Sequence, residues 1–207
     1  MYRSQPAEIP ISVEMGLGMD KDRKTSIADA AIELLGTQGA RALTHRGVDA
    51  LAGLPMGSTS FYCRTKAELL ALTLLRHAAL DMADMQTDAV HLKGLALTLP
   101  TFVDLVVHRM AEWASPGHRT RLKARFELFL MASRDPQLSK VLHEQRQAFL
   151  QFVEVQLRAL HMKDPSTRAL ALVMAVDGLL LAQVGSDASV MTQAQQRAMF
   201  TWVLSQS

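Results

Sequence analysis

The segment 52–66 brings together residue types that suit contact with a phosphate backbone. It reads AGLPMGSTSFYCRTK, and small or hydroxylated residues stand at the start of its last apolar piece: Gly57, Ser58, Thr59 and Ser60. A helix that begins with such residues can approach a duplex closely, and its first N–H groups and hydroxyls can meet phosphates or base edges. The chemistry that this stretch offers is therefore binding of nucleic acid.

Basic residues flank the segment where helices are expected to begin. Thr44 and Arg46 open the helix before it, and Lys66 opens the helix after it, so each cation lies beside an N-terminus that favours a phosphate. Residues 21–66 carry seven Lys or Arg against four Asp or Glu, a balance of +3. The excess is modest, but its sign is the one that a DNA-binding surface needs.

Four helices are expected to position these residues. Apolar residues at helical spacing mark one face of the first helix, which Gly36 and Gly39 end: Ile27, Ala30, Ala31, Leu34 and Leu35. Thr44 caps a second helix that runs to about residue 51, Pro55 starts a short third helix, and Thr65 caps a fourth that runs to about residue 85. The second and third helices, with the turn between them, form a helix-turn-helix. Their spacing also fits a helical hairpin whose Ser and Thr residues only cap helix ends.

The rest of the chain continues the helical pattern. Longer amphipathic helices are expected at five places, separated by turns that contain proline or glycine: 98–114, 118–134, 136–162, 165–184 and 192–205. No segment shows the alternating, β-branched pattern of a strand. The predicted fold class is therefore all-α. Residues 1–20 carry two prolines and two glycines without a sustained period, which predicts a flexible N-terminal extension.

Composition indicates a globular protein of the cytoplasm. The 207 residues are 49% hydrophobic with a formal net charge of +2, which excludes a disordered chain. The single cysteine, Cys63, cannot form an intrachain disulfide, and the N-terminal sequence lacks the pattern of a secretory signal. The most apolar run, 169–184, is interrupted by Asp177 and is too short to cross a membrane. We expect a buried helix there, no membrane partner, no cofactor and no metal.

An arginine stands inside the apolar stripe of the helix expected at 98–114. Arg109 must therefore have an acidic partner or face a cavity, and the candidate partners are Asp177, Glu127 or a polar group on a ligand. This half of the chain could form an effector cavity in which Arg109 and Asp177 are the polar groups that contact the ligand. Its predicted apolar lining residues are Phe102, Val106, Trp113, Phe126, Phe129, Phe149 and Phe152. Core packing of each aromatic side chain, and a structural Arg109–Asp177 salt bridge, are the alternatives.

Residues 21–75 resemble the N-terminal domain of the TetR family of transcriptional regulators. The resemblance rests on IADAA at 27–31, Gly39, Thr44, Val48, AGL at 52–54, GST at 57–59, FY at 61–62 and TKAELL at 65–70. It implies a DNA-binding helix-turn-helix domain at 21–66 and an effector-binding and dimerisation domain at 67–207. By the same resemblance, helices 165–184 and 192–205 would form a four-helix bundle with those of a second copy.

The resemblance also places individual contacts. Phosphate contacts fall on Thr44, Tyr62 and Lys66, and base-reading contacts on Met56, Ser58 and Phe61. With the residues singled out above, the predicted DNA-contacting set is Thr44, Arg46, Met56, Gly57, Ser58, Thr59, Ser60, Phe61, Tyr62 and Lys66. Ser60 stands where the family often has an aromatic residue, which puts one phosphate contact in doubt. Cys63 stands where a core phenylalanine is common, which predicts an apolar filler rather than a redox switch.

The resemblance therefore implies a homodimeric, ligand-responsive repressor that binds double-stranded, pseudo-palindromic DNA and a small, largely apolar effector. An enzyme is disfavoured because no HExxH, GxSxG, GxxxxGK or paired CxxC motif occurs in the sequence. A helical adaptor that does not bind DNA is the other alternative. Only the small charge excess and Ser60 favour it.

Overall fold

All regular structure in the described part of the chain is helical. The computed structural model describes residues 11–91, 97–185 and 190–205, and within these ranges every element is an α-helix. The all-α prediction is confirmed.

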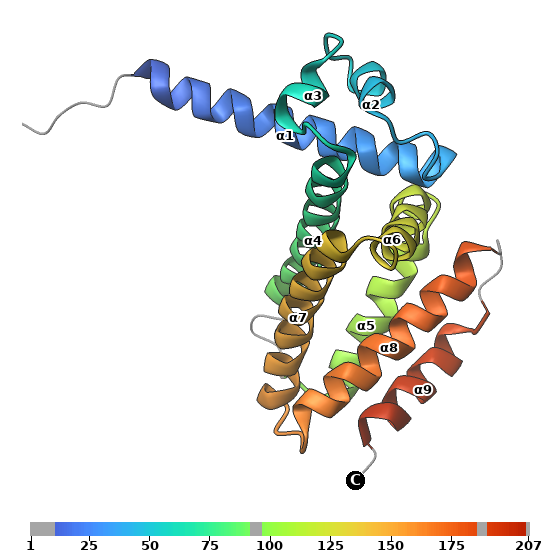
Figure 1. Cartoon of the computed structure of the whole chain (residues 1–207). Helices are drawn as coiled ribbons and strands as arrows, with labels where there is room; N and C mark the ends of the chain where they lie inside the picture. The colour runs from blue at the N-terminus through green and yellow to red at the C-terminus, as the bar shows by residue number, and fades with distance from the viewer. Residues whose placement is uncertain (1–10, 92–96, 186–189, 206–207) are drawn as a thin grey trace, which may run out of the picture.

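The first three helices form one end of the molecule. Helix α1 (Ile11–Gln38) crosses this end, and α2 (His45–Leu51) and α3 (Ser58–Tyr62) lie on its outer side (Figure 1). Helix α4 (Lys66–His91) then runs away from α1 into the rest of the molecule. Because α4 follows α3 in the chain after a short connection, a movement of α4 along its axis would also move the α2–α3 hairpin.

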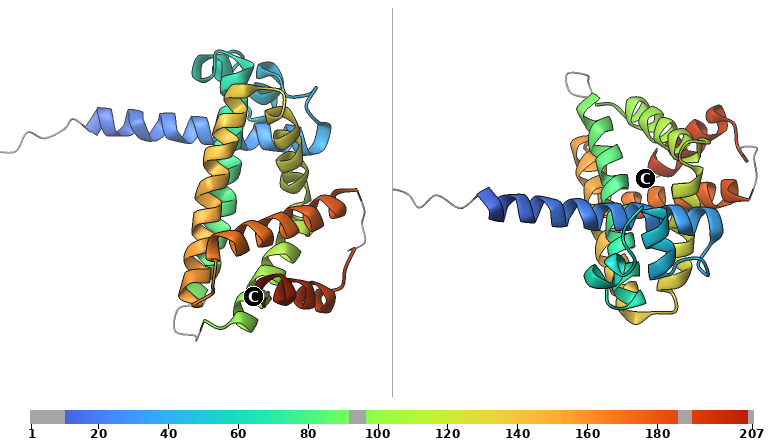
Figure 2. Two further views of the ribbon diagram at one scale, coloured as in Figure 1. Left: turned by 60° about the horizontal axis from the view of Figure 1, so that its bottom comes forward. Right: turned by 90° about the horizontal axis from the view of Figure 1, so that it is seen from above.

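The remaining helices build a larger body on the inner side of α1. They are α5 (Leu99–Ala114), α6 (Arg119–Ala132), α7 (Pro136–Ala159), α8 (Pro165–Val184) and α9 (Gln193–Ser205). Helices α4 and α7 lie side by side, α7 packs against α8, and α9 packs against α5 and α8 (Figure 2). Helix α6 packs along α1 and also contacts α5, α7 and α8, so it joins the two parts.

Three helix limits differ from those expected. Helix α1 begins at Ile11, ten residues earlier than the predicted start, so only residues 1–10 of the expected flexible extension lie outside the described residues. The two glycines near its start weaken a helix by about 1 kcal/mol each but do not break it. Helix α4 continues to His91. Helix α3 begins at Ser58 rather than Pro55, because Gly57 has a φ of +92° that a right-handed helix cannot accommodate.

Two predicted helix ends are confirmed. The side chain of Thr44 accepts a hydrogen bond from the backbone N–H of Gly47 at 3.0 Å, which caps α2. Gly39 follows α1 with a φ of +78°, the left-handed geometry that often ends a helix. Gly36, which was expected to end the helix, lies inside it instead.

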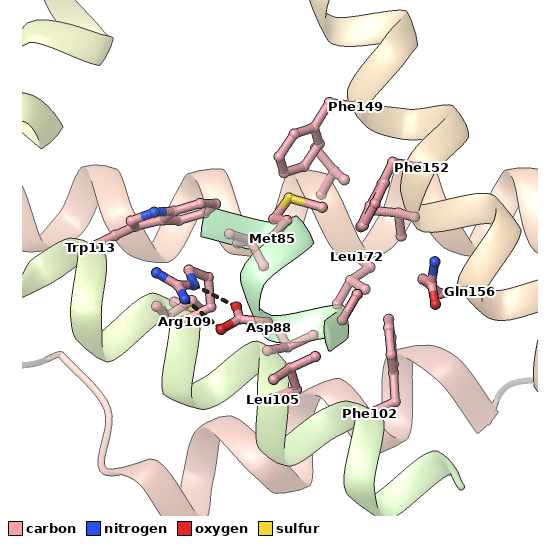
Figure 3. A pocket seen from close by; sticks show the side chains of 16 residues that line it. Met85, Asp88, Phe102, Leu105, Arg109, Trp113, Phe149, Phe152, Gln156 and Leu172 are labelled. Carbon is pink, nitrogen blue, oxygen red and sulfur yellow. Dashed lines mark hydrogen bonds and ion pairs between the residues drawn. The ribbon is translucent and has the colours of Figure 1, made fainter. Parts of the chain in front are cut away.

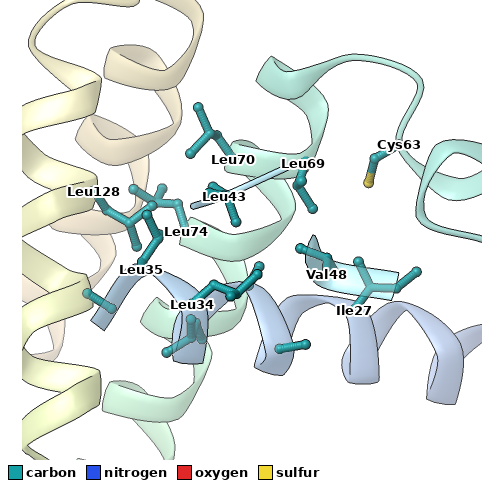
Figure 4. Packing of buried hydrophobic residues seen from close by; sticks show 14 of the residues in the cluster. Ile27, Leu34, Leu35, Leu43, Val48, Cys63, Leu69, Leu70, Leu74 and Leu128 are labelled. Carbon is teal, nitrogen blue, oxygen red and sulfur yellow. The ribbon is translucent and has the colours of Figure 1, made fainter. Parts of the chain in front are cut away.

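The core of the first part is built from α1, α2, α4 and α6. Its side chains come together from residues far apart in the sequence (Figure 4): Ile27, Leu34, Leu35, Leu43, Val48, Cys63, Leu69, Leu70, Leu74 and Leu128. Cys63 is 3% exposed, and burial raises the pKa of its thiol. A buried thiol with a raised pKa is a poor nucleophile, so the prediction of an apolar filler is confirmed.

The junction between the two parts depends on a glycine. A Cβ added at Gly36 would lie 2.0 Å from the backbone carbonyl oxygen of Thr120, far inside van der Waals contact. The absence of a side chain at Gly36 therefore lets α1 pack directly on the first turn of α6.

We expect Gly36→Ala to lower the free energy of unfolding by about 1–3 kcal/mol, because the backbone of one helix must move to relieve the overlap. The melting temperature should fall by roughly 5 °C. Gly117→Ala is the control, since a Cβ at Gly117 meets nothing within 4 Å. Thermal unfolding followed by circular dichroism would measure both variants. An unchanged melting temperature for Gly36→Ala would show that this contact is not tight in solution.

Helix α8 is longer than the apolar run that the sequence marked. Its 20 residues are long and apolar enough to cross a membrane by length and composition alone, so the argument that it is too short is wrong. The helix instead packs against α5, α6, α7 and α9. Leu172 and Leu180 are among its residues in the core of the second part. Helix α8 is thus a packed helix of this body, with one side still open.

Candidate functional site

A buried carboxylate holds α3 against α2. Asp49 is 3% exposed, and its Oδ2 accepts the backbone N–H of Gly57 at 2.8 Å. Its Oδ1 accepts the backbone N–H of Thr59 at 2.7 Å and the Thr59 hydroxyl at 2.6 Å. His45 adds a second link, since its Nε2 lies 2.8 Å from the carbonyl oxygen of Cys63 at the end of α3. The angle between the two helices is therefore set by polar contacts as well as by packing.

This arrangement corrects part of the predicted phosphate site. The N–H groups of Gly57 and Thr59 donate to Asp49, and the N–H of Ser58 donates to the carbonyl oxygen of Pro55 at 3.1 Å. Thr59 is also fully buried, so its hydroxyl cannot reach a phosphate. The N–H groups of Gly57, Ser58 and Thr59 are thus already bonded within the protein and are not free for a phosphate.

Asp49 has a pKa below its usual range. Burial raises the pKa, but the hydrogen bonds from the Thr59 side chain and from the Thr59 and Gly57 backbone outweigh this effect. A carboxyl group whose pKa is lower in the folded state stabilises the fold above its unfolded-state pKa, and this contribution is lost as the pH falls through the folded-state value.

Asp49→Asn should therefore be less stable than the parent by about 1–3 kcal/mol at neutral pH, because an amide cannot accept all three hydrogen bonds. The difference in melting temperature should shrink as the pH falls from about 5 to 3, since the parent then loses the charge as well. Asp22→Asn removes the same charge from an exposed position and serves as the control. A gap that stayed constant with pH would mean that folding does not lower the pKa of Asp49.

Most of the predicted DNA-contacting side chains are accessible. Met56 and Phe61 are 81% and 78% exposed, although the Phe61 ring contacts the Tyr62 ring, whose centroid is 5.1 Å away. We call the exposed members of the predicted set the recognition surface: Thr44, Arg46, Met56, Gly57, Ser60, Phe61 and Lys66. Ser58 is half-buried and donates its hydroxyl to the carbonyl oxygen of Pro55 at 2.6 Å. Contact of these residues with DNA stays a prediction.

Tyr62 is tied to α1 in this structure. Its hydroxyl donates to Oδ1 of Asp20 at 2.9 Å, and this hydrogen bond raises the pKa of the tyrosine. A phosphate contact from Tyr62, as predicted, requires the hydroxyl to exchange Asp20 for the phosphate. Asp20 was not singled out from the sequence because the two residues are 42 positions apart.

A small apolar cavity, cavity 1, lies in the body between α4, α5, α7 and α8 (Figure 3). Its volume is about 80 Å³. The predicted effector residues that line it are Phe102, Val106, Arg109, Trp113, Phe149 and Phe152. Met85, Asp88 and Gln156 also line it and were not predicted. Its wall is apolar apart from one ion pair and one amide.

The ion pair of cavity 1 joins α5 to α4. Arg109 Nε donates to Asp88 Oδ2 at 2.6 Å, and its Nη2 donates to Asp88 Oδ1 at 2.5 Å (Figure 3). Arg109 Nη1 also lies 3.8 Å from Asp84 Oδ2, and the hydrogen bond with Asp88 is the first cause of a raised pKa for Arg109. Arg109 therefore has an acidic partner, as expected, but the predicted partners Asp177 and Glu127 are wrong.

A second cavity, cavity 2, lies on the other side of Phe149. Its volume is about 280 Å³, and Phe149 and Val173 line both cavities. Its polar wall contains His77, Asp81, Arg125, Arg146 and Asp177. The predicted residues Phe129 and Asp177 belong here rather than to cavity 1.

Phe126 lines neither cavity. Its ring packs edge-on against Phe129, with the ring centroids 5.8 Å apart. For Phe126 the alternative of core packing is correct. The single predicted cavity is thus two cavities, and the aromatic set is divided between them.

Aspartates on one face of α4 connect the cavities. Asp81, Asp84 and Asp88 follow one another at helical spacing. Asp81 pairs with Arg125 at 2.8 Å and with Arg121 at 3.6 Å. Asp84 pairs with Arg121 and accepts the Trp113 indole N–H at 2.8 Å. The regular spacing of these acids was the sequence signal that could have identified α4 as the partner of the arginines.

One side of α8 and part of α9 are apolar and exposed. Leu170, Met174 and Leu181 on α8 are 46%, 49% and 55% exposed, and Trp202 on α9 is 63% exposed. We call these four residues the dimer face. In a single chain they leave apolar surface in contact with water, which is the usual mark of an interface.

Comparison with known proteins identifies the class of this chain. A family model described as the C-terminal domain of tetracyclin repressor-like proteins matches residues 97–206, more than half of the chain. The chain belongs to the TetR family of transcriptional regulators. This is a family of regulators rather than enzymes, so the sequence-based interpretation of the class is confirmed. No curated protein gave a sequence match.

Solved structures agree with this assignment. The multidrug binding protein EbrR, in complex with ethidium, is 30% identical with a TM-score of 0.69, and the alignment covers 89% of this chain and 99% of EbrR. A TetR-family member from Streptomyces coelicolor is 29% identical with a TM-score of 0.70, covering 88% and 98%. A transcriptional regulator from Rhodococcus is 17% identical with a TM-score of 0.71, covering 87% and 93%, and supports the fold alone.

Proposed function

We propose that this TetR-family regulator is a cytoplasmic, homodimeric repressor that leaves a pseudo-palindromic DNA operator when a small, largely apolar effector binds. The observation that carries the proposal is the position of α4. This helix begins with Lys66 beside the recognition surface, and it contributes Met85 and Asp88 to cavity 1. One rigid element therefore connects the two sites that a ligand-responsive repressor needs.

The recognition surface supports the DNA-binding part of the proposal. Arg46 and Lys66 supply exposed cations, while Met56 and Phe61 are free to contact base edges or thymine methyl groups. The Asp49 contacts hold α3 at a fixed angle, so these side chains are presented together. A fixed recognition helix suits docking in the major groove.

The dimer face supports the two-fold part of the proposal. A dimer through α8 and α9 would cover Met174 and Leu181 with their counterparts in a second copy. Because a two-fold dimer carries two identical recognition surfaces, its operator should have two inverted half-sites.

Cavity 1 supports an apolar effector, but it must widen to hold one. At about 80 Å³ it is well below the roughly 300 Å³ at which pockets for drug-sized molecules begin. A ligand that enters must push α4, α5, α7 or α8 apart. The structures of EbrR with ethidium, proflavin and malachite green show that a similar protein binds aromatic, positively charged dyes.

The widening gives a physical route to release from DNA. A ligand that binds only the widened cavity favours the arrangement in which α4 has moved. A few kcal/mol of differential affinity between the two arrangements are enough to shift the population. Movement of α4 changes the distance between the two recognition surfaces of the dimer, so the affinity for the operator falls.

An electrophoretic mobility shift with the DNA upstream of the protein's own gene, over a series of salt concentrations, tests the proposal. We expect a saturable shift that survives excess unrelated DNA. A calorimetric titration of the protein with malachite green then tests the effector part without DNA. A protein that binds this dye but shifts no specific DNA would favour the helical adaptor instead.

Lys66→Ala should weaken binding to all DNA sequences alike and reduce the slope of log K against log salt by about one unit, because a phosphate contact carries no base information. Met56→Ala should instead change which base is preferred at one position of each half-site. Lys163→Ala removes the same charge from the loop between α7 and α8, at the far end of the molecule from α3, and is the control. If Lys66→Ala changed base preference without changing the salt slope, the orientation of α3 on DNA would be wrong.

A further inference from the structure

Arg125, whose side chain lines cavity 2, has a buried donor without a partner. The Arg125 side chain is 9% exposed. Its Nη1 donates to Asp81 at 2.8 Å, and its Nη2 donates to Asp177 at 3.0 Å. Its Nε–H has no hydrogen-bond partner, and among the described side chains it is the one buried polar atom of this kind. A buried donor left unpaired costs about 1–3 kcal/mol, so an acceptor that reaches Nε would be stabilised by the same order.

Aromatic rings flank the same guanidinium group. Its central carbon lies 5.4 Å from the ring centroid of Trp113 and 5.6 Å from that of Phe129. The guanidinium of Arg146 lies 5.8 Å from the Phe129 ring centroid. Phe129 and Phe149 both line the cavity. An acceptor that binds Nε is therefore placed beside apolar walls that suit an aromatic body.

We propose that cavity 2 binds a small, neutral aromatic molecule through an oxygen acceptor such as a ketone or amide carbonyl, with the Nε–H of Arg125 as the donor. This inference rests on the proposed function, because it names the chemistry of the effector that the repressor would recognise. It places the polar contact of the effector in cavity 2 rather than at the Arg109–Asp88 pair of cavity 1.

The charges around Arg125 favour a neutral acceptor over a carboxylate. Asp81 and Asp177 already occupy its two Nη groups, and Arg121 and Arg146 complete their pairing. With Asp84 and Asp88, which pair with Arg121 and Arg109, the linked network holds four aspartates and four arginines. A ligand carboxylate would therefore add an uncompensated negative charge to a partly buried site. A carbonyl oxygen satisfies Nε without adding charge.

The volume of cavity 2 is closer than that of cavity 1 to what this class of ligand needs. At about 280 Å³ it approaches the size of known ligand pockets, whereas cavity 1 must first widen. The Arg125 side chain must turn to expose Nε, because this atom has almost no accessible surface. Because Phe149 and Val173 form a common wall, a ligand in cavity 2 also contacts the boundary of cavity 1. A ligand in cavity 2 can therefore change the shape of cavity 1, which is lined by Met85 and Asp88 of α4.

Isothermal titration calorimetry with three matched compounds tests the inference on the full chain in the absence of DNA. The probes are 2-acetylnaphthalene, 2-ethylnaphthalene, in which a methylene replaces the carbonyl, and 2-naphthoate, which carries a charge. We expect the ketone to bind about tenfold more tightly than the hydrocarbon, the usual effect of a hydrogen bond to a charged donor. We expect the carboxylate to bind more weakly than the ketone.

Arg125→Met should remove the preference for the ketone. In this variant Asp81 still pairs with Arg121, and Asp177 still pairs with Arg146. Neither carboxylate is left without a cation, so we expect the variant to fold. Arg121→Gln is the matched control, because it removes another buried arginine of α6 that lines neither cavity. If Arg125→Met does not fold, Ala78→Leu provides a second test. It fills cavity 2 and leaves Arg125 in place, and it should abolish binding of the ketone.

Three results would overturn the inference. They are no binding of the ketone up to its solubility limit, equal affinity for the ketone and the hydrocarbon, and failure of a variant to act as expected. Such a failure is a ketone preference that survives in Arg125→Met, or binding of the ketone that survives in Ala78→Leu. None of these depends on DNA. A protein that binds the ketone as expected but shifts no operator would contradict the proposed function alone, so the two failures are distinguishable.

Discussion

Leu181→Glu is expected to leave the chain as a folded monomer that binds the full operator at least about 100-fold more weakly than the parent. Leu181 is 55% exposed in the single chain, so the fold itself does not depend on it. In the proposed dimer, however, the glutamate would meet its own counterpart across the two-fold axis in an apolar interface. A monomer holds only one half-site, and loss of the linked second contact removes a factor of about 10²–10⁴ in affinity.

Sedimentation velocity would measure the oligomeric state, and fluorescence anisotropy of a labelled operator would measure the affinity. Leu130→Glu is the matched control, because Leu130 is 58% exposed but lies on α6, outside the dimer face. A Leu181→Glu protein that remained a dimer with the parent's affinity would place the interface elsewhere.

Truncation before Thr192, the obvious deletion at this interface, would not answer the same question. Phe200 and Leu204 of α9 are 0% and 1% exposed, so α9 is part of the core of a single chain. Its removal would unfold the body whether or not α9 also forms a dimer. A charge placed on the dimer face separates the two roles.

Local structure was largely predictable because its determinants lie close together in the sequence. Thr44 caps α2 through an N–H three residues away, and Gly39 ends α1 through its own backbone conformation. The apolar spacing around Leu34 and Leu35 marks the face of α1 that is buried. Each of these signals depends on a few consecutive residues, so one sequence is enough to show them.

Partners across the fold were not predictable in the same way. The spacing around Arg109 showed that it faces inward, but its partner Asp88 lies 21 residues away on a helix whose length was underestimated. Because α4 was expected to end near residue 85, Asp88 fell outside every predicted helix. Asp84 lay inside the predicted helix and is 3.8 Å from Arg109, yet it was not singled out either. The spacing along one helix does not show which other helix packs against it.

The exposed side of α8 shows a second reason why the sequence alone did not predict the whole structure. An apolar helix must be covered on all sides, and that expectation does not say by what. In the single chain Leu172 and Leu180 are buried, while Met174 and Leu181 on the same helix are exposed. The chain itself thus covers only part of the apolar surface of α8. The part that stays exposed is the physical basis for proposing that a second copy of the chain covers it.

Arg109→Met is expected to lower the free energy of unfolding by about 3–5 kcal/mol, and the melting temperature by roughly 10 °C. The reason is the partner left behind. Asp88 is 5% exposed, and both of its carboxylate oxygens accept hydrogen bonds from Arg109. Without the guanidinium its charge would be buried and uncompensated. This outcome differs from the expectation for an arginine that binds only a ligand, since such a residue could be replaced without loss of stability.

The double variant Arg109→Met/Asp88→Leu separates stability from effector response. It replaces the ion pair by apolar side chains of similar size, so most of the lost stability should return, and a double-mutant cycle of melting temperatures would measure the coupling.

If the Arg109–Asp88 pair only holds α5 to α4, the double variant should bind the operator and release it with effector as the parent does. If the effector acts by displacing this pair, the double variant should bind the operator but no longer release it. Operator occupancy measured against malachite green concentration, with a naked-operator control for binding of the dye to DNA, would decide between the two. Stability of the Arg109→Met single variant equal to that of the parent would contradict the buried ion pair itself.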